Sequence, residues 1–182
     1  MCELPSRERM RRALTGELPD RIPLCETSIW PETLERWRRE GMPADVDPLV
    51  WLGMDRIVIS DFDCSLRLPV ERLCEDEETY VERDAEGAVW RRWKHKSAVP
   101  QHIDSVIQTP DDWLKYRDRL APARDRVPPN YGQLLSRSKT EDFWLAVKPR
   151  EPVWWILMTM GFERGLEFIA DFPDVAEEMI AT

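Results

Sequence analysis

Apolar residues with helical spacing follow the short polar start of the chain. Met10, Ala13 and Leu14 recur at i, i+3 and i+4, which places them on one face of a helix. Ser6 precedes them and is expected to be the N-cap, because its hydroxyl can accept a hydrogen bond from an unpaired backbone N–H. Gly16 follows them and adopts positive φ at little cost, so we expect the helix to end there.

Two strands and two further helices are expected next. Residues 21–27 predict a short buried strand, although a proline within them weakens the pattern, and residues 56–60 predict a second strand. Between these strands, Pro31 is expected to open a helix that ends at Gly41, and residues 47–48 are expected to open a shorter one. The order helix, strand, helix, helix, strand is typical of α/β proteins.

The next part of the chain departs from this alternation. Residues 78–96 predict two strands joined by a turn in which Gly87 supplies positive φ. Thr109 predicts a helix start, because it is followed by a proline at N1 and an acid at N3, and this helix is expected to continue to Leu120. The remaining elements are expected to be a loop at 124–129, a strand at 143–148, and helices at 152–160, at 163–170 and from Asp171 onward.

The expected strands do not complete a domain by themselves. Core strands with helices between them predict an open parallel sheet, and such sheets usually contain more strands and are covered on both faces. The final residues AEEMIAT fall within an amphipathic helical pattern that has no glycine to end it. The sequence is therefore expected to be the first half of a larger α/β domain.

Six segments, spread in order over nearly the whole chain, form a set. They are SRERMRRALTGELPDRIPL, PETLERWRREGMP, LGMDRIVISDFD, CEDEETYVERDAEGAVWRRWKHKSAVPQHID, TPDDWLKYRDRL and MGFERGLEFIADFPDVAEEMI. The set resembles the N-terminal part of the uroporphyrinogen decarboxylase superfamily. The resemblance implies that residues 1–182 are the N-terminal half of a (β/α)8 TIM barrel, truncated after roughly its first half, with a β-hairpin inserted at about residues 78–96.

This superfamily resemblance implies two possible activities. One is cofactor-independent decarboxylation of the acetate side chains of uroporphyrinogen III. The other is methyl transfer between methyl-corrinoid proteins and thiols such as coenzyme M, or from methylated small substrates, with zinc activating the thiol. The decarboxylases carry an Arg-Gln-Ala-Gly-Arg-Tyr segment after the first strand, where this chain reads CETSIWPETLERW. Because bidentate arginines suit a substrate with many carboxylates, the sequence favours the methyltransferase-type or uncharacterised branch.

Two alternatives to a methyltransferase remain. The first is a uroporphyrinogen decarboxylase of porphyrin biosynthesis. The second, from a different class, is a non-catalytic or split half-barrel that needs a partner chain. We expect a His-x-Cys pair and a later Cys beyond residue 182 if the zinc mechanism operates, because the methyltransferases place their ligands in the second half of the barrel.

Candidate catalytic residues follow the strand predicted at 56–60. Active residues of (β/α)8 barrels lie at the C-terminal ends of strands, and Asp61 and Asp63 stand at that position. Ser60-Asp61 resembles a Ser-Asp pair of the decarboxylases, whose Asp interacts with the pyrrole N–H groups. The competing interpretation is that both aspartates are solvated loop or capping residues.

Candidate substrate-binding residues follow the other predicted strands. Besides Ser60, they are Glu26 and Trp30 after the strand at 21–27, and Lys148 and Arg150 after the strand at 143–148. Glu26 could bind a cation or act as a base, and Trp30 could stack on a flat ligand. Lys148 and Arg150 could pair with a substrate carboxylate. The alternatives are a strand-end carboxylate, a core tryptophan and solvated loop charges.

Composition narrows the partners that are expected. The net charge is −9 and the isoelectric point about 4.9, which disfavours nucleic acid and anionic membranes. The basic run RRWKHK, residues 91–96, is better explained by side-chain alternation on a strand. The expected partners are a small-molecule substrate, a corrinoid protein as methyl carrier and a second copy in a homodimer.

Cysteine and histidine positions bear on metal binding and location. The four cysteines, at positions 2, 25, 64 and 74, form no CxxC pair, and only His95 and His102 accompany them. No metal ligands are therefore expected in this chain, and zinc is expected only through the other half of the barrel. The charged N-terminus and the absence of an uncharged run longer than 11 residues predict a cytoplasmic protein.

Overall fold

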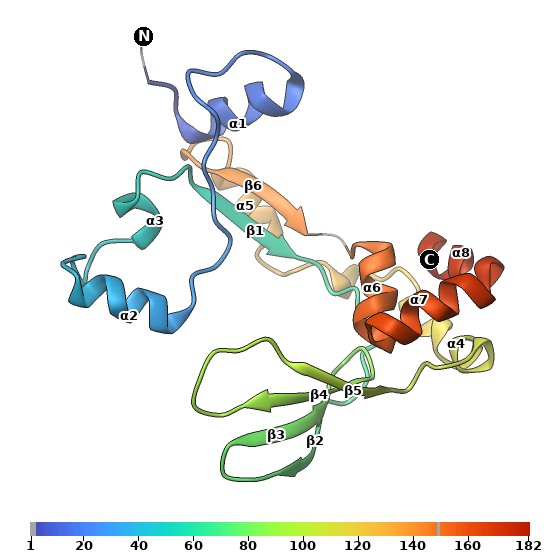
Figure 1. Ribbon diagram of the computed structural model, residues 1–182. Coiled ribbons are helices and arrows are strands. Elements are labelled where there is room, and N and C mark those ends of the chain that lie inside the picture. Colours follow the sequence, from blue (N-terminus) through green and yellow to red (C-terminus); the bar gives the residue numbers. More distant parts are fainter. Residues whose placement is uncertain (1–2, 149) are drawn as a thin grey trace. The chain divides into compact units, whose positions relative to one another are not determined.

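The computed structural model describes residues 3–148 and 150–182, which form two compact units (Figure 1). Within the described residues, unit 1 comprises 3–62 and 127–148, and unit 2 comprises 63–126 and 150–182. These residues form eight α-helices and two small sheets, so the protein has a mixed α/β fold. The predicted α/β class is confirmed, and the half-barrel stays a prediction.

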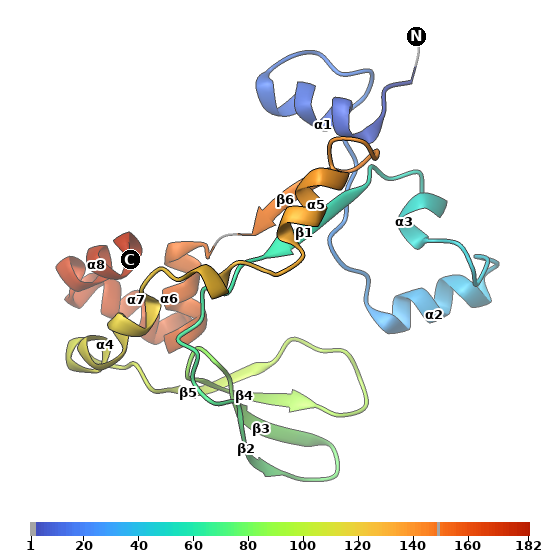
Figure 2. The same cartoon turned by 180° about the vertical axis from the view of Figure 1, so that it is seen from behind.

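Unit 1 is organised around a parallel pair of strands. β1 (Ile57–Asp61) pairs with β6 (Trp144–Lys148), and the two lie side by side in both views (Figure 1, Figure 2). Both strands were expected, within a residue of these bounds. The helices of unit 1 are α1 (Ser6–Thr15), α2 (Pro31–Arg39), α3 (Pro48–Trp51) and α5 (Tyr131–Arg137).

The helix ends of unit 1 follow the sequence signals, with one exception. Gly16 ends α1 in the left-handed region at φ 77°, and Asp47 caps α3 by accepting hydrogen bonds from two backbone N–H groups, as expected. The prediction that Ser6 is the N-cap of α1 is wrong, because Pro5 occupies that position. The Ser6 hydroxyl instead accepts a hydrogen bond from the backbone N–H of Arg56 at 3.1 Å, just before β1.

The strand predicted at residues 21–27 is not formed. Leu24 exchanges hydrogen bonds with Asp55 instead: its N–H donates to the carboxylate at 3.0 Å, and its carbonyl accepts from the Asp55 N–H at 2.5 Å. Pro23 has no N–H to contribute to a ladder. The side chains of Ile22 and Leu24 are 79% and 53% exposed, so the apolar pattern does not mark a buried strand here.

A buried ion network joins three separate segments of unit 1. Arg9 is 2% exposed, and its guanidinium bonds both oxygens of Asp20, at 2.7 and 2.8 Å. Another of its nitrogens contacts Asp55, which is 1% exposed and also accepts from Arg21 at 2.7 Å. The Arg9 hydrogen bonds hold the pKa of Asp20 well below its usual range. Helix α1 is thereby fixed to the segment that leads into β1.

Unit 2 contains a four-stranded antiparallel sheet. Its order is β2 (Glu71–Glu75), β3 (Thr79–Arg83), β4 (Ala88–Trp93) and β5 (Gln101–Ser105). The predicted hairpin is β3–β4, and Gly87 in its turn has φ 83°, as expected. A Cβ on Gly87 would lie 2.2 Å from the side chain of Val106, so a larger residue cannot fit. The outer strands were not predicted.

Four helices complete unit 2, at positions close to those predicted. They are α4 (Pro110–Tyr116), α6 (Pro152–Met160), α7 (Phe162–Asp171) and α8 (Pro173–Ala181). Thr109 and Asp112 form the expected capping box, and a 3-10 turn continues α4 to Leu120. The segment predicted as a loop at 124–129 begins with a further 3-10 turn at residues 124–126.

The core of unit 2 is formed mainly by aromatic and large aliphatic side chains. Trp113 of α4 meets Trp155 of α6 edge to face at 6.1 Å between ring centroids. Further buried members are Leu66, Ile107, Ile156, Met160, Phe168 and Met179. None of the helices in the described residues is both long and apolar enough to cross a membrane.

Replacing Asp55 by Asn tests the ion network of unit 1. Loss of the charge leaves the buried Arg9 guanidinium partly uncompensated, so we expect the free energy of unfolding to fall by about 3–5 kcal/mol. Urea unfolding followed by circular dichroism measures this change. Glu40→Gln is the control, because the Arg36–Glu40 pair is exposed and should contribute almost nothing. Equal stability of the two variants would contradict the assigned role of Asp55.

Candidate functional site

Ser60, Asp61 and Lys148 lie together at the carboxyl end of the parallel strands in unit 1. Asp61 is the register partner of Lys148, and Ser60 that of Val147. Register partners project to the same face of a sheet, so a carboxylate and an ammonium group share one face at this end. Ser60 is 3% exposed, and its hydroxyl has no hydrogen-bond partner among the described residues. Asp61 and Lys148 therefore offer two opposite charges to solvent at the strand end, whereas the unsatisfied Ser60 hydroxyl is buried.

Asp63 belongs to unit 2, although only one residue separates it from Asp61. Its carboxylate accepts from the Ser65 N–H and hydroxyl, at 3.0 and 2.6 Å, and from Arg67 at 2.5 Å. Burial acts to raise its pKa, but these donors and the Arg67 charge outweigh it and lower the pKa to about 2. Asp63 is thus a fixed anion at neutral pH, and its contacts favour the capping interpretation.

The two candidates after residue 24 differ in their surroundings. Glu26 accepts hydrogen bonds from the N–H groups of Thr27, at 2.7 Å, and Ser28, at 3.3 Å, and these bonds lower its pKa. Its carboxylate therefore stabilises a turn. Trp30 precedes α2 and is 47% exposed, which excludes the alternative of a core tryptophan and leaves its ring accessible to a ligand.

Arg150 lies in the wall of a pocket of about 330 Å³ in unit 2. Its Nη1 donates to the Cys64 carbonyl at 3.1 Å, and its guanidinium lies 4.0 Å from the centre of the Trp155 ring. Burial lowers the pKa of Arg150, and the nearby Glu86 charge opposes that change. Asp63 and Arg126 also line the pocket. The structure therefore places Asp63 with Arg150 in unit 2, and Asp61 with Lys148 in unit 1.

The Glu86 carboxylate beside Arg150 was not predicted from the sequence. It accepts a hydrogen bond from the Trp155 indole N–H at 2.8 Å, and burial raises its pKa. Glu86 belongs to the turn of the β3–β4 hairpin, and Trp155 lies in an apolar helix. The two positions are far apart in the sequence, and no local spacing connects them. The signal that could have found them is a tryptophan N–H in an apolar run, because a buried indole usually needs an acceptor.

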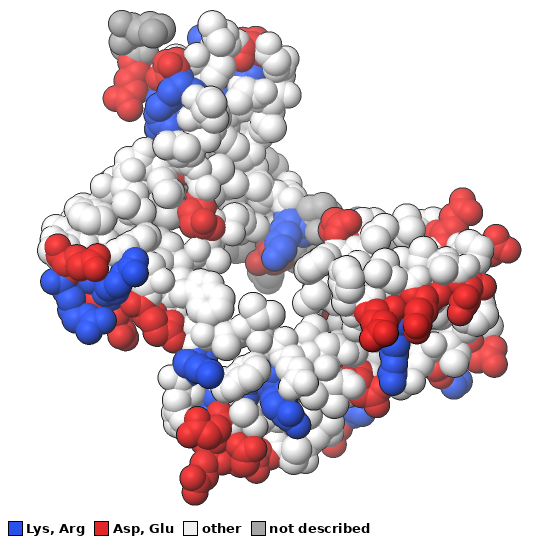
Figure 3. All heavy atoms as spheres, in the orientation of Figure 1, with Lys and Arg blue, Asp and Glu red and all other residues white. Residues whose placement is uncertain are grey.

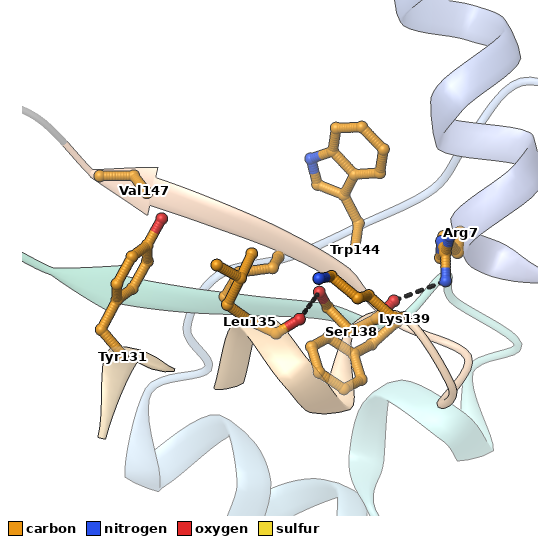
Figure 4. Close-up of a pocket in the computed structure, with 9 residues that line it drawn as sticks. Arg7, Tyr131, Leu135, Ser138, Lys139, Trp144 and Val147 are labelled. Carbon is orange, nitrogen blue, oxygen red and sulfur yellow. Dashed lines mark hydrogen bonds between the residues drawn. The ribbon is translucent and has the colours of Figure 1, made fainter. Parts of the chain in front are cut away.

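Another pocket, of about 260 Å³, lies beside β6 and α5 in unit 1 (Figure 4). Arg7 donates to the Ser138 carbonyl at 2.7 Å, and the Ser138 hydroxyl donates to the Leu135 carbonyl at 2.9 Å. These polar groups satisfy one another. None of the predicted site residues lines this pocket, so we do not assign the candidate site to it.

The basic run at residues 91–96 alternates in β4 as far as Trp93, where the strand ends. Arg92 pairs with Glu82 at 2.6 Å, whereas Arg91 donates to Gln101 on the other neighbouring strand at 3.3 Å. In the face shown in Figure 3, Lys and Arg side chains lie in small groups among Asp and Glu. The alternation predicted for residues 91–96 is therefore formed only as far as residue 93, and Lys94 instead pairs with Glu75 at 3.3 Å.

The Glu86–Trp155 contact can be tested by titration. The Trp155 indole N–H resonance, assigned with Trp155→Phe, is expected to shift with pH because its acceptor gains a proton. Since burial raises the Glu86 pKa, the midpoint should lie above the ordinary glutamate value of 4.5. Glu86→Gln, which keeps an acceptor and cannot titrate, should abolish the shift. A midpoint at or below 4.5 in the wild-type protein would be the contrary result.

A metal ion would need several ligand side chains that come together. Within residues 3–148 and 150–182, no three His, Cys, Asp or Glu side chains form a group that could hold a metal ion, and Cys2 lies outside these ranges.

The chain matches no protein-family model, no curated protein and no solved structure.

Proposed function

We propose that the chain is part of an enzyme of the uroporphyrinogen decarboxylase superfamily, of the methyltransferase type. It would act on a small methylated substrate with a corrinoid as methyl carrier. The observation that carries this proposal is the position of Ser60, Asp61 and Lys148 at the carboxyl end of two parallel strands. In (β/α)8 barrels, that end of the sheet carries the active site. The parallel pairing and the mixed α/β fold support the half-barrel, and the six sequence segments support the family.

We assign roles in the proposed site to Asp61, Lys148 and Trp30. Asp61 is exposed at the strand end and serves as the proton acceptor or donor toward the substrate. Lys148 shares its face and stabilises negative charge on the substrate. Trp30, with its accessible ring, supplies a stacking surface for a flat ligand.

Zinc is not assigned to the described residues. In the methyltransferases of this superfamily, zinc supplies thiol activation. The described residues contain no group of three ligand side chains, so they do not fit that metal. The proposal therefore routes no step of the reaction through zinc on this part of the chain.

Two alternatives have specific support. Ser60-Asp61 also suits a porphyrinogen decarboxylase, but the region CETSIWPETLERW lacks the Arg-Gln-Ala-Gly-Arg-Tyr segment whose arginines bind the substrate carboxylates. A split half-barrel that needs a partner chain is favoured by apolar side chains exposed in unit 1. Examples are Leu18, Ile22, Leu24, Val50 and Trp51, which are between 45% and 88% exposed.

The Asp61→Asn substitution tests the proposed function. The assay follows loss of methylcobalamin in the presence of a thiol acceptor, and uroporphyrinogen decarboxylation is measured in parallel. Removing a general acid or base should lower kcat/KM by about 10²–10⁴-fold. Asp45→Asn, at an exposed position before α3, is the control and should retain full activity. Full activity in Asp61→Asn would overturn the proposal, whereas a wild-type chain that catalyses neither reaction by itself would favour the split half-barrel.

A further inference from the structure

We propose that unit 2 contains a binding pocket for a small monocarboxylate, held by the guanidinium of Arg150. All residues of this pocket belong to unit 2. The inference therefore stands without the proposed function, which rests on the strand end in unit 1. A carboxylate is the natural partner of a guanidinium, because two parallel N–H donors match its two oxygens.

Arg150 has more hydrogen-bond donors than its protein contacts use. A guanidinium carries five N–H donors. Among the described residues, Arg150 donates from Nη1 to the Cys64 carbonyl at 3.1 Å and forms no ion pair with a carboxylate. The Trp155 ring, 4.0 Å away, holds the guanidinium plane in place. Arg150 is thus a positioned cation with most of its donors available.

The other arginine of the pocket, Arg126, already uses its donors in hydrogen bonds to the protein. Arg126 donates to the carbonyls of Asp63, Ser65 and Ala121, at 2.9, 3.0 and 3.2 Å, and also to that of Arg119. Its guanidinium therefore has no free pair of donors for a ligand. Arg150 alone offers such a pair, so the pocket suits a ligand with one carboxylate.

Two carboxylates lie near Arg150, those of Asp63 and Glu86. Asp63 lines the pocket, but it is bound to Ser65 and Arg67. Glu86 accepts from the Trp155 indole and forms no ion pair with Arg150 within the described part of the chain. Asp63 also lies 3.7 Å from Arg126, so its charge is already matched; Arg150 is left to balance one negative charge, and the second charge of a phosphate would have no partner. The charge balance thus selects singly charged ligands.

The pocket is small, and the rest of its wall is mostly apolar. The other lining residues are Leu120, Pro152, Met179, Ile180 and Ala181, with Thr182. The volume of about 330 Å³ is near the lower end of the range for small-molecule sites, about 300–1,000 Å³. A short aliphatic or aromatic body on the carboxylate fits this space, so the ligand class is a small monocarboxylic acid.

Isothermal titration calorimetry with benzoate and isobutyrate tests the pocket on the whole chain. Benzamide serves as the neutral counterpart of benzoate, and inorganic phosphate as the doubly charged competitor. Arg150→Gln should weaken benzoate binding at least 10-fold. The affinity of Arg150→Lys should lie between those of the wild-type protein and Arg150→Gln, because lysine keeps the charge but lacks the paired N–H donors of a guanidinium. Arg38→Gln is the matched control, since Arg38 is exposed on α2.

A second variant keeps the test valid if Arg150→Gln does not fold. Ile180→Trp enlarges a side chain of the pocket wall and leaves Arg150 in place, so it should also weaken benzoate binding at least 10-fold. Circular dichroism checks that each variant is folded. Unchanged affinity in both folded variants, equal binding of benzamide or phosphate, or no binding of either carboxylate by the wild-type chain overturns the proposal.

Discussion

The ion network formed by Arg9, Asp20 and Asp55 is the interaction on which unit 1 depends. Burying a charged group is costly unless it is paired and hydrogen-bonded, and here each charge has several partners. Asp55 immediately precedes Arg56 and β1, so its position sets where the strand begins. The network takes the place of the missing strand at residues 21–27, because Asp55 uses its carboxylate and N–H to bind the Leu24 backbone. The strand end with Ser60 and Asp61 is positioned by a salt bridge at the opposite end of the same strand.

In unit 2, close packing holds the elements together, whereas in unit 1 buried ion pairs do so. Gly161 separates α6 from α7 at φ 88°, and a Cβ there would lie 2.8 Å from the His102 ring of β5. The His102 ring also contacts the Thr159 carbonyl at 2.9 Å and meets Trp90 edge to face. His102 therefore joins the sheet to the helices, together with the Glu86–Trp155 contact and the Arg164–Asp104 ion pair. Arg150 then occupies the N-terminal approach to α6, where Trp155 and the Cys64 carbonyl hold it.

The elements that could be predicted from the sequence are those specified by local chemistry. The Thr109 capping box, the proline helix starts and the glycines with positive φ depend on a few adjacent residues, and they appear where expected. Strand β2 was missed because all five of its residues are exposed and three of them are charged, so it lacks the apolar alternation that marks a strand. Asp61 and Asp63 both follow the strand predicted at 56–60, and nothing in the sequence indicates that they belong to different units. Their separation into two units and the contact of Glu86 with Trp155 depend on tertiary packing, which a single sequence does not encode locally.

The exposed strand β2 has a consequence for the behaviour of the chain in solution. Its ion pairs, Glu71 with Arg83 and Arg72 with Glu75, lie along an edge with unpaired backbone groups. A strand from another molecule that added to this edge would have to remove water from those charges and accept the irregular register between Arg72 and Cys74. The charges that hid this strand from pattern analysis therefore protect the sheet from growing into an intermolecular aggregate.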